Sequence, residues 1–291
     1  MTGGFAPGTL VLVATPIGNL TDLPPRAVST LQDAELVCCE DTRRTGMLLQ
    51  RAGIRVKRLA VVNAHTERER VRQVLDALAV GVVALVSDAG TPGVSDPGEA
   101  LVRAALDAGF EVSAVPGPVA AVVALVVSGL PTDRFVFEGF LPRSGRDRAR
   151  RLHDIAAERR TVVLYEAPHR ITRTLTDLLD ACGPERRVAI ARELTKLHET
   201  VWRGALGDAA ERPGADNPIG EFVVVVEGAA EAPPPTGDDI AGAAQRALAR
   251  GLSARDAAAA VSEELGVGRR DAYAAVLAAR AGTVTPAPPD A

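Results

Sequence analysis

The sequence predicts an α/β protein with two α/β domains, followed by a small helical module. The chain of 291 residues is long for a single hydrophobic core and suits more than one domain. Short β-branched apolar runs alternate with amphipathic segments, which favours mainly parallel sheets covered by helices on both faces. A Pro/Ala-rich stretch at Ala229–Thr236 then indicates a linker to three further helical segments.

The first predicted domain covers residues 8–130 and alternates strands with helices. Its predicted strands are Leu10–Ala14, Leu36–Cys39, Arg58–Val62, Val82–Val86 and Glu111–Val115. Its predicted helices are Pro24–Leu31, Thr45–Ala52, Glu67–Leu78, Pro97–Ala108 and Val119–Ser128. Pro24 suits the first turn of a helix, where an N–H is not needed, and Gly53 suits a helix end. The third helix carries its apolar residues at helical spacing and is therefore amphipathic.

The second predicted domain covers residues 131–228, after a hinge at Gly129–Thr132. Its predicted strands are Phe135–Phe140, Thr161–Tyr165, Arg187–Ala191 and Glu221–Glu227, with a helix at Ile171–Cys182. The helical module covers residues 238–282. Its predicted helices are Asp238–Arg250, Ser253–Leu265 and Arg269–Ala281. Ser253 is a suitable N-cap for the middle one, because its hydroxyl accepts from a backbone N–H of the first turn.

Bulk composition excludes several classes of protein. Hydrophobic residues make up 47% and charged residues 24%, which is a globular composition. Aromatic residues make up 3%, which argues against a platform that stacks single-stranded bases. A net charge of −4 argues against bulk electrostatic capture of nucleic acid and leaves a local basic face open.

Cysteine usage and hydropathy predict a cytoplasmic protein. Cys38, Cys39 and Cys182 form neither a disulfide framework nor a metal quartet, so we expect reduced thiols and no metal site. The N-terminus has no signal-peptide pattern. The longest apolar run, Val119–Val127, is about half a membrane span, so no membrane partner is expected.

Two Gly/Pro-rich loops follow predicted strands and indicate a ligand site. One loop lies within Leu85–Gly98, and the other is Pro116–Ala120. Gly lets the backbone approach a ligand, and Pro holds a loop in shape. Ligands of open α/β sheets bind beyond the carboxyl ends of the strands, so a crevice is predicted there. Ordinary βα turns are the alternative interpretation.

Charged and polar side chains also gather where the strands end. They are Glu40, Asp41, Arg43, His65, Glu67, Asp88, Thr91, Glu166, His169, Arg170, Glu193 and Lys196. Solvated loop charge explains any one of them, but their common position favours a site. The dinucleotide, P-loop and nucleophile-elbow glycine motifs are absent, which argues against those three enzyme classes.

Six motifs in order resemble a known family. They are Thr15–Leu20, Glu40–Arg43, Ser87–Gly93, Pro116–Pro118, Tyr165–Arg170 and Arg192–Lys196. They are similar to motifs of the ribosomal RNA small subunit methyltransferase I family, whose members have the tetrapyrrole methylase fold with a cofactor cleft between two α/β domains. The resemblance covers about residues 8–228 and continues weakly through the helical module.

The resemblance implies S-adenosylmethionine as cofactor and 2′-O-methylation of a decoding-region cytidine in the 16S rRNA of the small ribosomal subunit. It also implies a homodimer, and no DNA partner. The implied cofactor residues are Pro16, Asp88, Ala89, Gly90, Thr91, Val94, Val119, Ala120, Tyr165, Glu166, Leu194 and Gly220. The family usually carries a small hydroxyl residue where this chain has Val119, so we expect backbone N–H groups at the next helix start to replace that bond.

Methyl transfer to a ribose hydroxyl needs alignment and a destination for the hydroxyl proton. The candidate catalytic residues are Glu40, Asp41, Arg43, Glu166 and Lys196. Lys196 acts as a base only if burial or nearby arginines keep it neutral. Lys196 and Arg43 could instead hold an RNA phosphate, and an ion pair of Lys196 with Glu193 or Glu199 is the structural alternative.

Two groups of arginines are candidate RNA contacts. The denser group is Arg143, Arg146, Arg148, Arg150 and Arg151, and the second is Arg255, Arg269 and Arg270. A solvated helix face is the alternative for the first group. Two other functions stay open: a small-molecule methyltransferase of the tetrapyrrole type, which the Arg-rich segment disfavours, and a non-catalytic RNA-binding relative.

Overall fold

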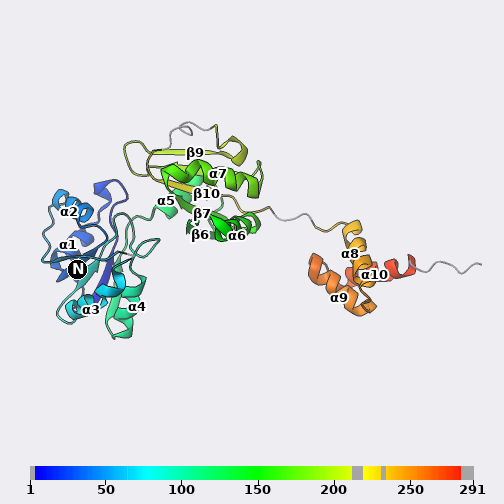
Figure 1. The fold of residues 1–291 in the computed structure, drawn as a ribbon, viewed down its shortest axis with the longest axis horizontal. Coiled ribbons are helices and arrows are strands. Elements are labelled where there is room, and N and C mark those ends of the chain that lie inside the picture. The colour runs from blue at the N-terminus through cyan, green and yellow to red at the C-terminus, as the bar shows by residue number, and fades with distance from the viewer. Residues whose placement is uncertain (1–3, 64, 212–218, 231–233, 283–291) are drawn as a thin grey trace, which may run out of the picture. The chain divides into compact units, whose positions relative to one another are not determined.

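The computed structural model describes residues 4–63, 65–211, 219–230 and 234–282. The chain forms two compact units, Met1–Ala229 and Ala230–Ala291 (Figure 1). The first unit contains two five-stranded sheets. The α/β class with a helical C-terminal region is confirmed.

The first sheet is entirely parallel, with strand order β3-β2-β4-β1-β5. The strands are β1 (Thr9–Val13), β2 (Leu36–Cys39), β3 (Leu59–Val61), β4 (Val83–Leu85) and β5 (Glu111–Val115). Because β1 lies between β4 and β5, the carboxyl ends of these three strands are neighbours. The loops that follow them therefore meet at one edge of the sheet.

Helices cover both faces of this sheet, as the continuous apolar strands predicted. They are α1 (Pro25–Asp33), α2 (Thr42–Arg51), α3 (Glu67–Leu78) and α4 (Glu99–Asp107). Leu10 and Leu85 pack with α3 and α4, whereas the adjacent Val11 and Ala84 pack with α1 and α2 (Figure 1). This alternation follows from the two-residue period of a strand.

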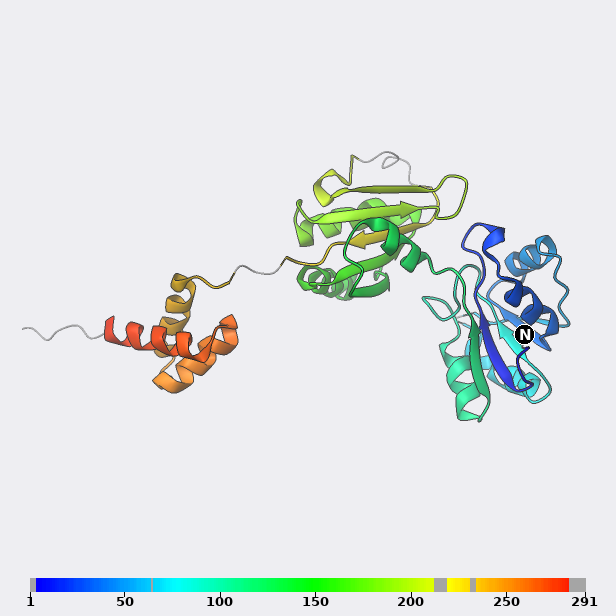
Figure 2. The ribbon, with the colours of Figure 1, turned by 180° about the vertical axis from the view of Figure 1, so that it is seen from behind.

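The second sheet is mixed, with strand order β6-β7-β10-β8-β9 (Figure 2). Its strands are β6 (Phe135–Phe140), β7 (Thr161–Glu166), β8 (Arg187–Arg192), β9 (Thr200–Ala205) and β10 (Phe222–Val226). β10 runs antiparallel to both β7 and β8, so the expectation of mainly parallel sheets is wrong for this one. Helix α5 (Ala120–Ser128) packs on one face, and α6 (Gly145–Ala157) and α7 (Pro168–Cys182) pack on the other.

Two elements of this sheet layer were not predicted. Strand β9 lies at the sheet edge and none of its residues is fully buried, so it lacks the apolar run of a buried strand. Helix α6 has few apolar residues, because the guanidinium of Arg148 takes an interior position. Helix α2 begins three residues before its predicted start, because the Asp41 carboxylate caps it by accepting from the Arg43 N–H.

The second unit consists of three helices in its described part. They are α8 (Gly237–Ala249), α9 (Ala254–Leu265) and α10 (Arg269–Gly282). Thr236 and Asp239 form a capping box on α8, and the predicted cap Ser253 accepts from the Asp256 N–H. Small apolar residues such as Ala243, Ala257 and Val261 form the core. In the described ranges of the chain, no helix has the length and apolar character needed to cross a membrane.

Candidate functional site

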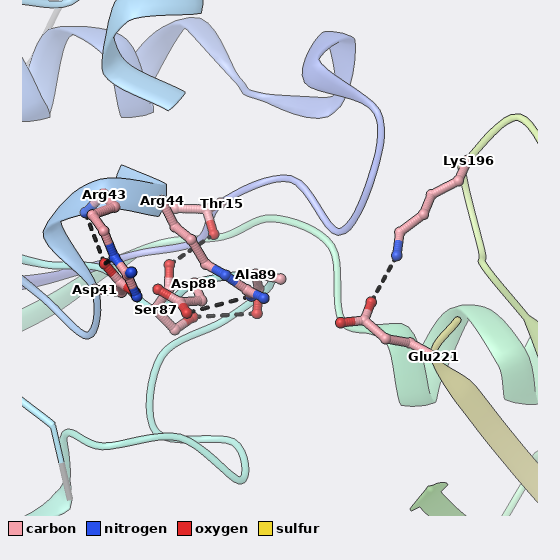
Figure 3. Close-up of polar contacts among 9 residues, drawn as sticks. All are labelled: Thr15, Asp41, Arg43, Arg44, Ser87, Asp88, Ala89, Lys196 and Glu221. Carbon is pink, nitrogen blue, oxygen red and sulfur yellow. Dashed lines mark hydrogen bonds and ion pairs between the residues drawn. The ribbon is translucent and has the colours of Figure 1, made fainter. Parts of the chain in front are cut away.

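The loops after β1 and β4 are joined by main-chain hydrogen bonds. The Thr15 N–H donates to the Gly90 carbonyl at 2.8 Å, and the Gly90 N–H donates to the Thr15 carbonyl at 3.0 Å. The buried Thr15 hydroxyl donates to the Ser87 carbonyl at 3.2 Å (Figure 3). Gly90 has φ +82°, a conformation that favours glycine, so the sequence suits this turn.

The loop after β5 packs against these two loops. The Thr91 hydroxyl donates to the Pro118 carbonyl at 3.4 Å. A Cβ on Gly117 would lie 2.7 Å from the Ala14 Cβ, so only glycine permits this approach. The three Gly/Pro-rich loops thus form one wall, as their positions at adjacent strand ends predicted.

The opposite wall comes from the second sheet, and the antiparallel β10 explains its composition. Phe222, the first residue of β10, pairs with both Glu166 at the end of β7 and Arg192 at the end of β8. The residues just before β10 therefore lie beside those just after β8. The Glu221 N–H accordingly donates to the Glu193 carboxylate at 2.9 Å.

A cavity of about 380 Å³ lies between these walls, within the range of small-molecule sites. Its lining residues are Ile17, Ala89, Gly90, Thr91, Val94, Ser95, Asp96, Val119, Ala120, Phe140, Tyr165, Glu166, Ala167, Pro168, Leu194, Lys196, Glu221, Phe222 and Val223. The Tyr165 ring packs against Phe137 and Phe140 at centroid distances of 5.0 and 5.6 Å. Its hydroxyl accepts from the Ala121 N–H at 3.2 Å, which ties β7 to the start of α5.

Nine of the twelve residues expected to bind a cofactor line this cavity. They are Ala89, Gly90, Thr91, Val94, Val119, Ala120, Tyr165, Glu166 and Leu194. Pro16, Asp88 and Gly220 do not line it, but each adjoins a residue that does. Val119 is the N-cap of α5 and makes no side-chain cap bond, so a backbone N–H at this end is the donor that the chain offers.

Sequence reasoning missed Ser95, Asp96 and Glu221 as lining residues. Ser95 and Asp96 lie in the Gly/Pro-rich loop that first indicated a site, so the Ser-Asp-Pro-Gly run was the available signal. Both also line a second cavity of about 750 Å³, together with Glu40 and Glu67. Glu221 directly precedes β10, and only the pairing of β10 between β7 and β8 brings Glu221 to the site.

Asp41 and Arg43 do not line the first cavity. Arg43 is 88% exposed and pairs with Asp41 at 2.7 Å (Figure 3). The hydrogen bonds that Arg43 donates lower the pKa of Asp41 to about 2. Asp41 is thus a helix cap and a poor proton acceptor near neutral pH.

Glu40 and Asp88 lie close together beside the first sheet. Desolvation raises the pKa of both carboxyls, the charge of Asp88 raises the pKa of Glu40 further, and the charge of Asp41 raises that of Asp88. Arg44 lies 3.4 Å from Asp88 and partly offsets that effect (Figure 3). Glu40 lines only the second of the two cavities.

Glu166 is 2% exposed and its carboxylate is fully engaged. It accepts from the Thr174 hydroxyl at 2.6 Å and from the Ala167 N–H at 2.9 Å, and it pairs with Arg170 at 3.2 Å. These bonds hold the end of β7 and the start of α7. Glu166 therefore shapes the cavity wall.

Lys196 takes the ion-pair alternative that the sequence left open. Its ammonium lies 2.8 Å from Glu193 and 2.8 Å from Glu221 (Figure 3). Partial burial acts to lower the pKa of Lys196, but the hydrogen bonds and charges of the two carboxylates outweigh it, so the pKa is raised. The neutral form that a Lys196 base requires is therefore disfavoured.

The Arg-rich segment is a poorer RNA surface than expected. Arg148 is 4% exposed and bonds to Asp177, Thr174 and the Pro142 carbonyl, so its assignment to that surface is wrong. Arg150 forms an exposed ion pair with Asp147, and Arg151 pairs with the largely buried Glu138. The exposed arginines of this group without such a pair in the described chain are Arg143 and Arg146.

The guanidinium groups of the second arginine group are accessible to a ligand. Arg255, Arg269 and Arg270 are exposed at the starts of α9 and α10. None of them makes an ion pair or a side-chain hydrogen bond within the described ranges of the chain. They stay candidate RNA contacts.

Comparison with known proteins places this chain among methyltransferases. The model of the Tetrapyrrole (Corrin/Porphyrin) Methylases matches residues 9–210. A relative from Synechocystis sp., named ribosomal RNA small subunit methyltransferase I, is 46% identical over 269 residues, which cover 91% of this chain and 96% of the relative. The chain belongs to the ribosomal RNA small subunit methyltransferase I family.

Other relatives and solved structures match different shares of this chain. A Thermotoga maritima relative with the same name is 45% identical over 222 residues, covering 76% of this chain and 99% of its own. A solved structure, uroporphyrin-III C-methyltransferase from Thermus thermophilus with S-adenyl homocysteine, covers 75% of this chain and 96% of its own. It is 22% identical with a TM-score of 0.53, and it confirms the tetrapyrrole methylase fold. The expected family and methyltransferase class are confirmed.

Proposed function

We propose that this protein transfers a methyl group from S-adenosylmethionine to the 2′-hydroxyl of a cytidine in the decoding region of 16S rRNA. The observation that carries this proposal is the similarity over 91% of the chain to a relative named for methylation of small-subunit rRNA. The substrate is the small ribosomal subunit, so the reaction belongs to the cytoplasm.

The first cavity suits S-adenosylmethionine. Tyr165, Phe140 and Leu194 offer an apolar and aromatic surface for the adenine. The start of α5 offers backbone N–H groups and a positive helix end for the carboxylate. Within the described residues, the buried Thr195 Oγ1 and Asp88 Oδ1 have no hydrogen-bond partner, and each of these residues adjoins one that lines the cavity.

The cofactor supplies a methyl group on a positively charged sulfur, which is a good leaving group. The task of the protein is therefore to align the acceptor oxygen with that methyl group. The bonds between Thr15, Ser87 and Gly90 fix the loop that forms one wall. On the other wall, Lys196 is held by Glu193 and Glu221 as a protonated cation. We assign Lys196 to the positioning of a phosphate, with Arg43 as an outer contact.

Radiolabelled methyl transfer to unmodified small subunits tests this proposal. Naked 16S rRNA and a tetrapyrrole serve as parallel acceptors. Label at one cytidine that resists alkaline cleavage is expected, since a 2′-O-methyl group blocks that cleavage. Label in the tetrapyrrole alone, or no label with the cofactor bound, contradicts the proposal and favours the small-molecule or the binding-only function.

We also propose a homodimer for the active protein. Helix α5 exposes 45% of Val122 and 64% of Val126, and Phe140 at the cavity is 52% exposed. Exposed apolar side chains grouped near a site are typical of an interaction surface. Light scattering at several concentrations measures the mass, and a monomer at every concentration that supports activity contradicts this part.

The division of the first unit into domains of residues 8–130 and 131–228 stays a proposal. Each sheet has its own buried cluster, which supports a division into two domains, whereas α5 packs on the second sheet although the proposed boundary follows it. Limited proteolysis is expected to cut first within Gly129–Thr132. Cleavage inside either sheet before the hinge contradicts the boundary.

A further inference from the structure

Asp96 lines both of the cavities described above. It lines the smaller cavity with Tyr165, Val119 and Leu194, and it lines the larger one with Glu40 and Glu67. Glu40 lines only the larger of these cavities, and Glu221 and Glu166 line only the smaller one. Asp96 thus offers a carboxylate that faces both the cofactor cavity and a second, more open space.

The loop that carries Asp96 is held rigidly. Ser95 has φ +62°, which non-glycine residues rarely adopt, and Gly98 has φ +146°. The Glu67 carboxylate accepts from three N–H groups, those of Gly98, Ala100 and Leu101, at 2.9 to 3.1 Å. Such over-determined backbone strain is typical of functional positions.

The second sheet also constrains this loop. Strand β6 has a register irregularity between Phe137 and Gly139, and a Cβ on Gly139 would lie 2.9 Å from the Ser95 hydroxyl. Gly139 therefore allows the second sheet to approach the residue just before Asp96. The loop that carries Asp96 is thus approached by β6 at Ser95 and held by α3 at Gly98.

Two other carboxylates near the site are held by hydrogen-bond donors, and Glu40 and Asp88, whose pKa values are also raised, do not line the smaller cavity. Asp41 is a helix cap with a pKa of about 2, and Glu166 is fully engaged by three partners. Burial, aided by the charges of Glu40 and Asp88, raises the pKa of Asp96 to about 6, while the Ser87 hydroxyl opposes this shift. A base is most effective when its pKa lies near the operating pH.

We propose that Asp96 is the general base of this methyltransferase, a role that rests on the proposed function. The ribose 2′-oxygen forms a bond to the methyl carbon as the carbon–sulfur bond breaks, and the electron pair of that bond stays on the sulfur. The 2′-hydroxyl proton goes to a carboxylate oxygen of Asp96. The proton then leaves through the larger cavity, which opens away from the cofactor and contains Glu40.

This assignment predicts a pH dependence with a definite sign. Asp96 accepts a proton only when ionised, so the single-turnover rate should rise with pH and level off above about 6. The titratable and charged groups that line these cavities or act on Asp96 are Glu40, Glu67, Arg68, Asp88, Glu99, Arg103, Asp107, Tyr165, Glu166, Lys196 and Glu221. Among these, the pKa of Tyr165 is raised above 10, which places its titration outside this range.

The test compares Asp96→Asn with the wild-type protein in single-turnover methylation of small subunits. We expect a loss of at least about 100-fold and no acid limb in the pH profile of the variant. Asp96→Glu, which keeps a carboxylate, should recover part of the rate. Asp76→Asn removes an exposed carboxylate of α3 and should match the wild type.

Calorimetry with S-adenosylhomocysteine, which lacks the sulfonium charge, separates catalysis from binding and folding. Asp96→Asn should bind it within about threefold of the wild-type affinity, since a base contributes little to ground-state binding. The assignment is overturned if the methylation rate of Asp96→Asn stays within about threefold of the wild-type rate. It is also overturned if the variant loses rate as expected but its pH profile keeps the acid limb of the wild type.

Two controls keep this result separate from the proposed function. If the wild-type protein labels rRNA but its rate is constant between about pH 5 and about pH 8, Asp96 is not the base and the proposed function stands. This measurement needs no variant. If the wild-type protein binds cofactor and labels no RNA in any form, the proposed function fails and the assignment of Asp96 fails with it.

Discussion

At the scale of single residues, ionisable side chains divide into those that fix the fold and those that face the cavities. Arg148 and Glu166 come from motifs that sequence reasoning treated as functional, and both are buried in hydrogen-bond networks. Sequence identity cannot separate these roles, because a buried arginine and an RNA-binding arginine look alike in a polar segment. Asp96 is the opposite case. It lies in the loop that first indicated a site, but its role follows only from its position at the two cavities.

Replacement of Arg148 tests its structural role. Arg148→Ala leaves Asp177 and the Pro142 carbonyl without their main donor, so we expect a loss of about 3 kcal/mol in unfolding free energy. Urea denaturation measures this. The neighbouring Arg146→Ala removes an exposed guanidinium and should change stability by less than about 0.5 kcal/mol. Equal effects of the two variants would contradict the burial of Arg148.

Above its pKa, the ionised Asp96 should lower the free energy of unfolding. Its pKa is raised from 3.8 to about 6, so between these values the folded state holds more protons than the unfolded state. Stability from this group therefore falls as pH rises through about 6, and the penalty is complete above it. We expect Asp96→Asn to melt at a higher temperature than wild type at neutral pH. The difference should shrink as pH falls towards 4, whereas Asp76→Asn shows no such trend.

At the scale of elements, local sequence accounts well for the first sheet and less well for the second. The bounds predicted for β2, β5, β6 and α3 match those of the structure, because apolar runs and amphipathic spacing are local signals. The part of the site wall formed by Glu221 and Phe222 depends on the position of β10 between β7 and β8. That pairing is non-local, so no pattern around residue 220 could predict it.

The start of α4 provides a test at this scale. Glu67 caps this helix from the first residue of α3, so Glu67→Ala leaves three N–H groups without their acceptor. We expect a loss of about 1–3 kcal/mol in unfolding free energy. Hydrogen exchange at Ala100 and Leu101 should also accelerate. Glu69→Ala, on the same helix turn, is the control and should leave both measurements unchanged.

At the scale of the whole molecule, the two units differ in their relation to the family. The Thermotoga maritima relative is covered to 99% by a match that takes 76% of this chain. About a quarter of this chain thus has no counterpart there, and the α/β unit ends at Ala229. The family's chemistry therefore does not require every part of this chain, and Arg255, Arg269 and Arg270 of the helical unit stay candidates for a contribution to substrate affinity.

A variant truncated after Ala229 tests whether the two units have these separate roles. It should bind S-adenosylmethionine as the full chain does, because every lining residue of the smaller cavity precedes that point. It should bind small subunits more weakly and with a flatter salt dependence, since arginine–phosphate contacts are lost. Calorimetry and filter binding at several salt concentrations measure the two effects. An unchanged salt slope would remove the helical unit from the RNA surface.

The position of β10 has a consequence for synthesis. The central strand of the second sheet is the last one to be made, so β7 and β8 leave the ribosome with their facing edges unpaired. Unpaired apolar edges are sites of misassociation, and pairing between distant segments is slow. A translational pause before Val226 would therefore prolong the most aggregation-prone state of this chain, whereas a pause in the helical unit would let the α/β unit close first.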